Sequence, residues 1–243
     1  MTDPLAPLLE LPGVEDAIAA ARESVDVVHG HQANRRGWPA TAAEASVRAA
    51  RASAALAGGP ADIPDSGEVD DPRLAGALRI AESIGPLLPV WQRAPMQALA
   101  RLHVLAAADL VPDDELGRPR PSRAVTRRLD ILAELVTGGT SAPGPVVTAV
   151  VHGELLALSP FGSADGVVAR AAGRLSMIHT GLDPKGLIVP EVGFLRRADR
   201  YRAAAAGFAT GTEEGLADWI VLCCEAVEAG AREATSIADS VLT

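Results

Sequence analysis

Almost the whole sequence divides into segments with helical periodicity, each bounded by glycine, proline or a capping residue. In the first segment, apolar residues recur at helical spacing through Val14, Ala17, Ile18, Ala21, Val25 and Val28, which predicts a helix over residues 14 to 30. Similar patterns predict helices over about 41–58, 74–84, 95–110, 122–136, 144–158, 166–181, 195–208 and 213–241. No segment alternates apolar and polar residues as a half-buried strand does. The sequence therefore predicts an all-α protein, folded as a single compact multi-helix bundle.

Local signals place some of the helix ends. Thr41 followed by Glu44 is a capping-box pattern, which predicts that the second helix begins at Thr41. The glycine pair at 58 and 59 permits the left-handed turn that ends a helix. Residues 60 to 70 are polar and contain two prolines, so they are expected to form a loop, and Asp71-Pro72 opens the next helix.

The composition fits one helical domain. A chain of 243 residues with 48% hydrophobic residues can bury one sizeable core. Only 3% of the residues are aromatic, so leucine, valine, isoleucine and close alanine-mediated helix contacts must build that core.

Charge and hydropathy exclude several functions. A net charge of -9 would repel a phosphate backbone, and the pairs Arg127-Arg128 and Arg196-Arg197 are too short to form a basic stripe. No apolar run approaches the roughly 20 residues that cross a bilayer, and the start lacks a signal-peptide pattern. We therefore expect a cytoplasmic protein that neither binds nucleic acid nor inserts into a membrane. No Gly-x-Gly-x-x-Gly turn follows a strand, so dinucleotide-dependent redox chemistry finds no support.

Cys223 and Cys224 are adjacent within a predicted helix. Neighbouring helical cysteines do not bridge each other easily and lack metal-ligand spacing. They are interpreted as ordinary small thiols.

The most informative segment is a short predicted loop with the sequence Ser-Pro-Phe-Gly-Ser-Ala-Asp-Gly-Val-Val-Ala-Arg, residues 159 to 170. It resembles the signature of the Fic (Fido) family, His-Pro-Phe-x-x-Gly-Asn-Gly-Arg-x-x-Arg, in degenerate form. The matching positions are Pro160, Phe161, Gly166 and Arg170. The departures are Ser159 for histidine, Ala164 for glycine, Asp165 for asparagine and Val167 for arginine.

The surroundings of this loop occur in the order that the family requires. Residues 149–156 resemble the helix that leads into the loop, and residues 99–103 resemble the family's Leu-His helix. Residues 117–120 stand where the family has Gly-x-Tyr-Arg. Tyr201-Arg202, followed by a polar turn and the long last helix, resembles the C-terminal part of the family's fold. The resemblance thus implies a bundle of Fic type with a core at 95–243 and a helical extension at 1–94. The Ala- and Arg-rich composition suggests an actinobacterial type of this family.

The extension contains a second, weaker likeness. Ser53, Ala57 and Gly58 resemble the family's inhibitory helix motif, in which a glutamate would stand at position 57. In the family that glutamate pairs with the second signature arginine. Its loss implies that Arg170 is no longer restrained. The same residues are also typical of any alanine-rich helix that ends at glycine.

The resemblance implies a phosphate site at Ala164, Asp165, Gly166 and Arg170. Loop amides and a helix N-terminus would surround the phosphates of ATP or another nucleotide, Arg170 would pair with a phosphate, and Asp165 could hold Mg²⁺. Two alternatives stay open. Asp165 could simply cap the following helix, and Arg170 could lie on the surface or pair with Glu154.

Several features that the family's catalysis requires would be missing. Ser159 cannot replace a histidine base, and Val167 removes a charge from the phosphate clamp. The family's target-docking hairpin is also expected to be missing, because residues 121 to 136 are predicted as helix. Among other histidines, His152 lies about 10 Å from position 159 along the helix axis. His103 and His179 lie on apolar faces and are interpreted as structural.

Three functional hypotheses follow. The first is a non-catalytic binding or regulatory pseudoenzyme, whose partner would be another protein or a second copy of the chain. Small residues such as Ala203 to Gly207 could dock a partner or serve internal helix packing. The second is a divergent transferase of AMP or another nucleotide, or a phosphate-handling enzyme, using Asp165 and Arg170. In the third, the likeness to Fic is accidental.

Overall fold

The computed structural model describes residues 3–242, and within this range it contains helices and no strands. A 3₁₀ turn, η1 (Ala6–Glu10), precedes the first helix, and a π turn, η2 (Leu135–Gly139), follows the sixth. The α-helices are α1 (Val14–Gly30), α2 (Gln32–Arg36), α3 (Trp38–Leu56), α4 (Pro72–Arg93), α5 (Pro95–Ala107), α6 (Arg123–Glu134), α7 (Gly144–Leu158), α8 (Asp165–His179), α9 (Pro190–Arg196), α10 (Ala198–Ala209) and α11 (Glu213–Leu242). The prediction of an all-α bundle is confirmed.

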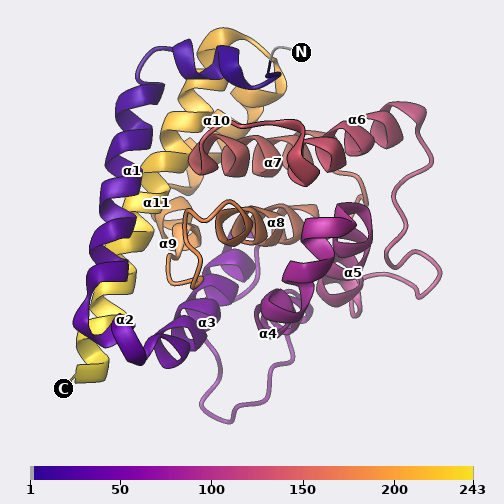
Figure 1. Ribbon diagram of the computed structural model, residues 1–243. Coiled ribbons are helices and arrows are strands. Elements are labelled where there is room, and N and C mark those ends of the chain that lie inside the picture. Colours follow the sequence, from indigo (N-terminus) through magenta and orange to yellow (C-terminus); the bar gives the residue numbers. More distant parts are fainter. Residues whose placement is uncertain (1–2, 243) are drawn as a thin grey trace.

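Helix α8 lies at the centre of the bundle (Figure 1). It packs along α7 and also contacts α3, α4 and α5. Every residue from Val167 to Met177 is buried, so this part of α8 has no solvent face. Two of the buried residues are arginines, Arg170 and Arg174. A guanidinium is stable in such surroundings only when hydrogen-bond acceptors enclose it.

The two ends of the chain form a second layer, in which α1 lies beside the long helix α11 (Figure 1). Five of the six residues whose spacing predicted α1 are buried and the sixth, Ala17, is partly buried, and the bounds of α1 are those predicted. Helices from the 1–94 segment also reach the rest of the protein directly, since α3 packs against α9 and α4 packs against α5 and α8.

Small residues bring the helices close together. A Cβ atom on Gly76 of α4 would lie 2.3 Å from the carbonyl oxygen of Ala106 on α5. A Cβ on Gly215 of α11 would lie 2.3 Å from the carbonyl oxygen of Gly207 on α10. The small residues of α10 therefore include one that serves internal packing. Trp91 and Trp219 are among the largest fully buried side chains.

Three of the predicted helices differ clearly from the structure. Helix α3 begins at Trp38, and Thr41 is a buried residue within it whose hydroxyl donates to Asn34 Oδ1 at 2.7 Å, so Thr41 is not a cap. Helix α4 continues to Arg93 with two prolines inside it, because Leu87 and Trp91 keep its buried face in the core. The predicted helix over 195–208 is two helices, separated at Arg197, where φ is −129° and ψ is 43°.

Other local predictions are confirmed. Gly58 has a φ of +84° in the turn that follows α3, and Asp71 caps α4 by accepting the N–H groups of Arg73 and Leu74. In the described part of the chain, none of the helices has both the length and the apolar character needed to cross a bilayer.

Candidate functional site

The loop between α7 and α8 is tightly wound. Ser159 and Ala164 adopt left-handed φ values of 43° and 51°, and within residues 3–242 they are the two non-glycine residues with positive φ. Such a conformation costs about 1–3 kcal/mol for a residue with a Cβ and persists only where the surrounding structure enforces it. Ala164 occupies the position at which the Fic signature has glycine. The loop therefore has a glycine-type backbone conformation at a position occupied by alanine.

The Asp165 carboxylate binds the loop's own backbone. Its Oδ1 accepts the Phe161 N–H at 2.9 Å, and its Oδ2 accepts the Gly162 N–H at 2.8 Å. The N-cap of α8 is Ala164, and Asp165 is the first helical residue, so the interpretation of Asp165 as the cap is wrong. Burial raises the pKa of Asp165, while these two N–H groups and nearby Arg120 oppose that rise.

Phe161 is fixed by stacking on His103. The two ring centroids lie 4.2 Å apart with an interplanar angle of 5°. His103 Nδ1 accepts the Gly117 N–H at 2.9 Å, so the proton is on Nε2, which donates to Ser163 Oγ at 3.0 Å. Burial lowers the pKa of His103. This histidine holds the loop in place, as a structural histidine would.

The segment 117–120 lies against the same loop. The Arg120 N–H donates to the carbonyl oxygen of Pro160 at 2.7 Å, and Arg120 Nη2 donates to that of Leu158 at 2.8 Å. Residues 117–120 and the loop, which the resemblance assigns to one site, are therefore neighbours in space.

Arg170 is enclosed by α3 and α10. Its Nε donates to Ser53 Oγ and its Nη2 to the Ser53 carbonyl oxygen, both at 2.8 Å, while Nη1 donates to Tyr201 Oη at 3.3 Å. Because Tyr201 Oη accepts from Arg170, its own O–H donates to His152 Nε2, 2.9 Å away. We call these four side chains, Ser53, Arg170, Tyr201 and His152, the Arg170 network.

Two interpretations of Arg170 are therefore wrong. The loss of a glutamate at position 57 does not leave Arg170 unrestrained, because Ser53, one turn earlier on α3, binds it. Nor does Arg170 pair with Glu154, whose carboxylate binds Arg128 Nη2 at 2.6 Å. Ala57 and Gly58 make the turn that ends α3. Of the three inhibitory-motif positions, Ser53 is the one that contacts Arg170.

His152 lies deep in the core. Its ring contacts Phe194, Tyr201 and Trp219. Burial, with a smaller contribution from the charge of Arg170, lowers the pKa of His152 to about 3. This histidine is therefore neutral at neutral pH.

The sequence offered no indication of one buried residue near the Arg170 network, Glu191, and did not assign Tyr201 to a site. Glu191 lies 3.7 Å from Arg174 Nη1, and its Oε2 has no hydrogen-bond partner. Burial raises its pKa. Glu191 belongs to α9, whose seven residues are too few to show helical periodicity, so the sequence offers no signal for it. Tyr201 was noted only for its position in the motif order.

The residues around the loop do not fit a resident Mg²⁺ ion. Each oxygen of Asp165 already accepts an N–H group, and across residues 3–242 no cluster of three or more His, Cys, Asp or Glu side chains could hold a metal. A magnesium site usually combines one or two carboxylates with substrate phosphates.

Comparison with known proteins gives a likeness in structure only. No family model matches the sequence, and no curated protein matches it significantly. Among solved structures, a Fic family protein from Desulfovibrio desulfuricans G20 superposes with a TM-score of 0.75 at 19% identity, over 93% of this chain and 74% of that one. The chain has the Fic fold. Fic-1 from C. elegans superposes with a TM-score of 0.73 at 15% identity, over 94% of this chain and 73% of that one.

Within this Fic fold, the predicted phosphate-binding residues lie together. Ala164, Asp165 and Gly166 are half-buried at the start of α8. The Arg170 guanidinium folds back beneath them, so that a Cβ on Gly166 would lie 3.2 Å from Arg170 Nη1. Ser159, at the signature histidine position, donates its hydroxyl to the Leu156 carbonyl oxygen at 3.0 Å, and Val167 is buried. That these residues bind phosphate stays a prediction.

Proposed function

We propose that this protein is a non-catalytic Fic-fold binding or regulatory module. The observation that carries the proposal is that both charged residues of the segment 159–170 form hydrogen bonds within the protein. Arg170 donates three hydrogen bonds to α3 and α10, and Asp165 accepts two from the loop backbone. A phosphate clamp needs a guanidinium whose donors are available to the ligand.

The chemistry of the residues at the loop also supports a non-catalytic protein. A transferase of this kind needs a base beside the target hydroxyl, and losing a positioned base typically removes about 10² to 10⁴ in rate. Ser159 is not basic. The His103 nitrogen nearest the loop, Nε2, already carries a proton and donates it to Ser163. His152 is buried, and its Nε2 is hydrogen-bonded to Tyr201.

The module would act through its surface. Its partner would be another protein or a second copy of the chain, in the cytoplasm, with no role for nucleic acid. The tightly packed bundle, with its ordered loop, supports a scaffold that presents a fixed surface.

The test is a nucleotide-transfer assay. The purified protein is incubated with ATP, GTP, CTP or UTP labelled at the α-phosphate, with Mg²⁺ or Mn²⁺, alone and with a cell lysate. An active Fic enzyme serves as the positive control. We expect no transfer, either for the natural sequence or for Ser159→His, because Arg170 stays engaged when the histidine is restored. Transfer by the natural sequence would overturn the proposal.

A second candidate function, nucleotide binding with or without residual transfer through Asp165 and Arg170, has one observation in its favour. Within the described range, the backbone N–H groups of Ser163, Ala164, Asp165 and Gly166 have no hydrogen-bond acceptor in the protein. Such groups at a helix N-terminus favour an anion. Calorimetric titration with ATP, ADP and GTP, with and without Mg²⁺, tests it. If phosphate binds there, Asp165→Asn should tighten binding, because it removes a negative charge from the site. Absence of binding to both forms would dismiss this candidate.

A further inference from the structure

A cavity of about 480 Å³ lies between α3, α4 and the loop that joins α8 to α9. Most of its wall is apolar, and the larger apolar side chains that line it are Trp38, Val47, Leu78, Ile84, Leu88 and Ile178. Pockets for small molecules typically have volumes of about 300–1,000 Å³ and mainly apolar walls with a few polar groups. This cavity has both properties, and it lies outside the loop of residues 159–166.

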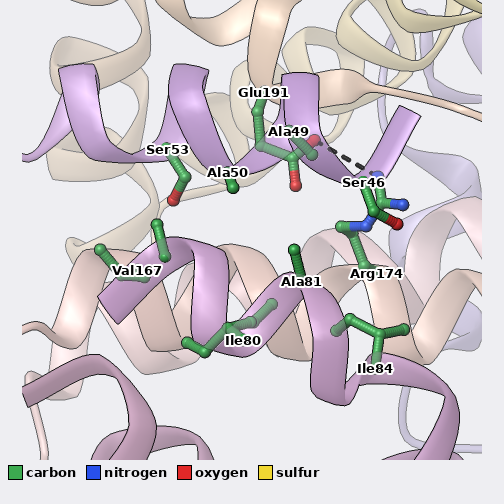
Figure 2. Close-up of a pocket in the computed structure, with 12 residues that line it drawn as sticks. Ser46, Ala49, Ala50, Ser53, Ile80, Ala81, Ile84, Val167, Arg174 and Glu191 are labelled. Carbon is green, nitrogen blue, oxygen red and sulfur yellow. Dashed lines mark ion pairs between the residues drawn. The ribbon is translucent and has the colours of Figure 1, made fainter. Parts of the chain in front are cut away.

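The inner end of the cavity carries no free charge. Ser46, Ala81, Ile84 and Arg174 line both the cavity and a narrow crevice that continues between α3 and α4 (Figure 2). Arg174 faces Glu191 at 3.7 Å and donates to the carbonyl oxygens of Ile188 and Gly186 at 2.8 and 3.2 Å. Its charge thus faces a carboxylate, and both of its terminal nitrogens donate to the backbone of the protein. The crevice holds about 20 Å³, which is room for a water molecule and no more.

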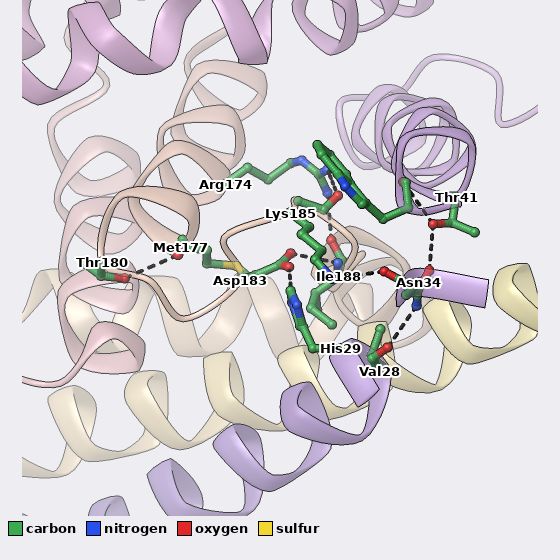
Figure 3. A network of polar contacts seen from close by, with 12 residues as sticks. Val28, His29, Asn34, Thr41, Arg174, Met177, Thr180, Asp183, Lys185 and Ile188 are labelled. Atoms are coloured by element: carbon green, nitrogen blue, oxygen red, sulfur yellow. Dashed lines mark hydrogen bonds and ion pairs between the residues drawn. The ribbon is translucent and has the colours of Figure 1, made fainter. Parts of the chain in front are cut away.

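A cation without an acidic partner borders the cavity. Lys185 is the only lysine of the sequence, in a chain that otherwise uses arginine. Its Nζ donates one hydrogen bond, to the Asn34 carbonyl oxygen at 2.9 Å, and within residues 3–242 it forms no ion pair. Asp183, two residues earlier, is bound to His29 and to the Ile188 N–H, both at 2.8 Å (Figure 3). Two donors of the Lys185 ammonium therefore remain for a ligand.

An aromatic surface completes the cavity. Trp38 is 39% exposed, whereas the other two tryptophans, Trp91 and Trp219, are fully buried. A large exposed aromatic side chain at an apolar hollow is typical of a contact surface for a ligand. Among the described residues, the one acidic side chain that lines the cavity is Glu82, which is exposed on α4.

We infer that this cavity binds an amphiphilic small molecule with one carboxylate group and an apolar body. The carboxylate pairs with Lys185, and the apolar body lies against Trp38, Leu78 and Ile178. This inference is independent of the proposed non-catalytic function and adds a ligand site to it.

The test titrates the intact protein with sodium octanoate, 1-octanol and octylammonium chloride, below their aggregation concentrations. Calorimetry gives the affinity, and tryptophan emission reports on Trp38, the one tryptophan that a ligand can reach. We expect octanoate to bind about three- to tenfold more tightly than octanol, since a charge-assisted contact adds to the same apolar burial. Octylammonium should bind most weakly.

Three variants locate the site. Lys185→Met keeps the length of the side chain and should reduce octanoate affinity to that of octanol, with octanol affinity unchanged. Trp38→Phe should remove the emission change and keep the calorimetric signal. Ala81→Phe, which fills the cavity, should abolish binding of both ligands. Equal affinities for octanoate and octanol, or octanoate binding that Lys185→Met does not alter, would overturn the inference.

The cavity could instead be covered by a second copy of the chain. Light scattering at each titration point separates that outcome, because octanoate would then dissociate a dimer. A dimer that octanoate dissociates would overturn the inference of a ligand site. A scattering mass that stays constant through saturation supports it.

Discussion

Arg170 illustrates how a buried charge is accommodated without an ion pair. All three of its nitrogens donate to oxygen atoms, two of Ser53 and one of Tyr201. A buried charged donor that loses its acceptor costs more than an ordinary hydrogen bond contributes, because the group stays desolvated. The hydroxyl of Ser53 is therefore a small group with a large effect on the stability of the fold.

Replacing Ser53 by alanine should lower the free energy of unfolding by about 1–3 kcal/mol, because Arg170 Nε loses its acceptor while Nη2 keeps the backbone oxygen. Urea denaturation monitored by circular dichroism measures the change. Ser46→Ala, on the same helix, is the matched control, since the Ser46 hydroxyl has no hydrogen bond in the described residues; we expect it to change stability by less than about 0.5 kcal/mol. Equal effects of the two substitutions would show that the contact with Arg170 contributes nothing.

The pKa of His152 makes stability depend on pH. Its value of about 3 in the fold lies below the ordinary 6.5, because of burial and then the charge of Arg170. Below pH 6.5 the unfolded chain takes up a proton that the folded chain refuses, so stability falls as pH falls, by at most about 1.4 kcal/mol per pH unit. Asp165 and Glu191 have raised pKa values and act in the opposite direction, since their protonated forms are favoured in the fold.

His152→Gln isolates this effect, because glutamine does not titrate and still offers an acceptor to Tyr201. Unfolding in urea is measured for both proteins at several pH values between 7 and 5. We expect the stability of the natural protein, relative to the variant, to fall by about 1 kcal/mol per unit below pH 6.5. Parallel pH profiles would mean that His152 takes up protons equally in the folded and unfolded chains.

Among the helices, α4 contains two glycines in opposite surroundings. Gly76 faces the backbone of α5, and a Cβ added to it would lie only 2.3 Å from the Ala106 carbonyl oxygen. A Cβ added to Gly85 would have no atom within 4 Å. Helix propensity alone favours alanine over glycine by about 1 kcal/mol at either site. The two positions therefore separate the intrinsic preference from the packing.

Gly76→Ala should lower the free energy of unfolding by about 2 kcal/mol or more, because α4 and α5 must move apart. Gly85→Ala should raise it by up to about 1 kcal/mol. Thermal and urea denaturation of both variants measure the difference. If Gly76→Ala were as stable as the natural protein, the close approach of α4 and α5 would be absent.

The predictability of each helix depends on where its stabilising contacts lie. The bounds of α1 follow from apolar spacing, because a single face packs on α11. Helix α4 passes through two prolines, and α9 is short, so tertiary packing decides both and local sequence does not. The same holds for the site. The signature positions identify the loop from local sequence, whereas the contact of Arg170 with Ser53 joins residues 117 positions apart and has no local signal.

In the molecule as a whole, the first and last α-helices pack against each other. Helices α1 and α11 lie side by side (Figure 1), and the buried residues of α1 include Val14, Ala21 and Val28, which have no solvent exposure. Helix α4 adds the fully buried Leu74 and Trp91 to the same core. Residues 1–94 thus supply a large share of the apolar surface that the remaining helices cover, although the sequence divides the chain near residue 94.

A fragment of residues 95–243 should therefore fail to fold, and the two cysteines of α11 report on this. Cys223 and Cys224 are buried in the full chain, and burial raises the pKa of Cys224 to about 12 and that of Cys223 well above its usual value. Neutral, covered thiols react slowly, because the thiolate is the nucleophile. We expect almost no labelling of the full chain by a disulfide reagent at pH 8, rapid labelling of both thiols in the fragment, and the same rapid reaction for the full chain in concentrated urea. Slow labelling of the fragment would show that 95–243 forms the core without the first four helices. Helices α1 to α4 would then be an addition to a self-sufficient Fic fold, and not part of what holds it together.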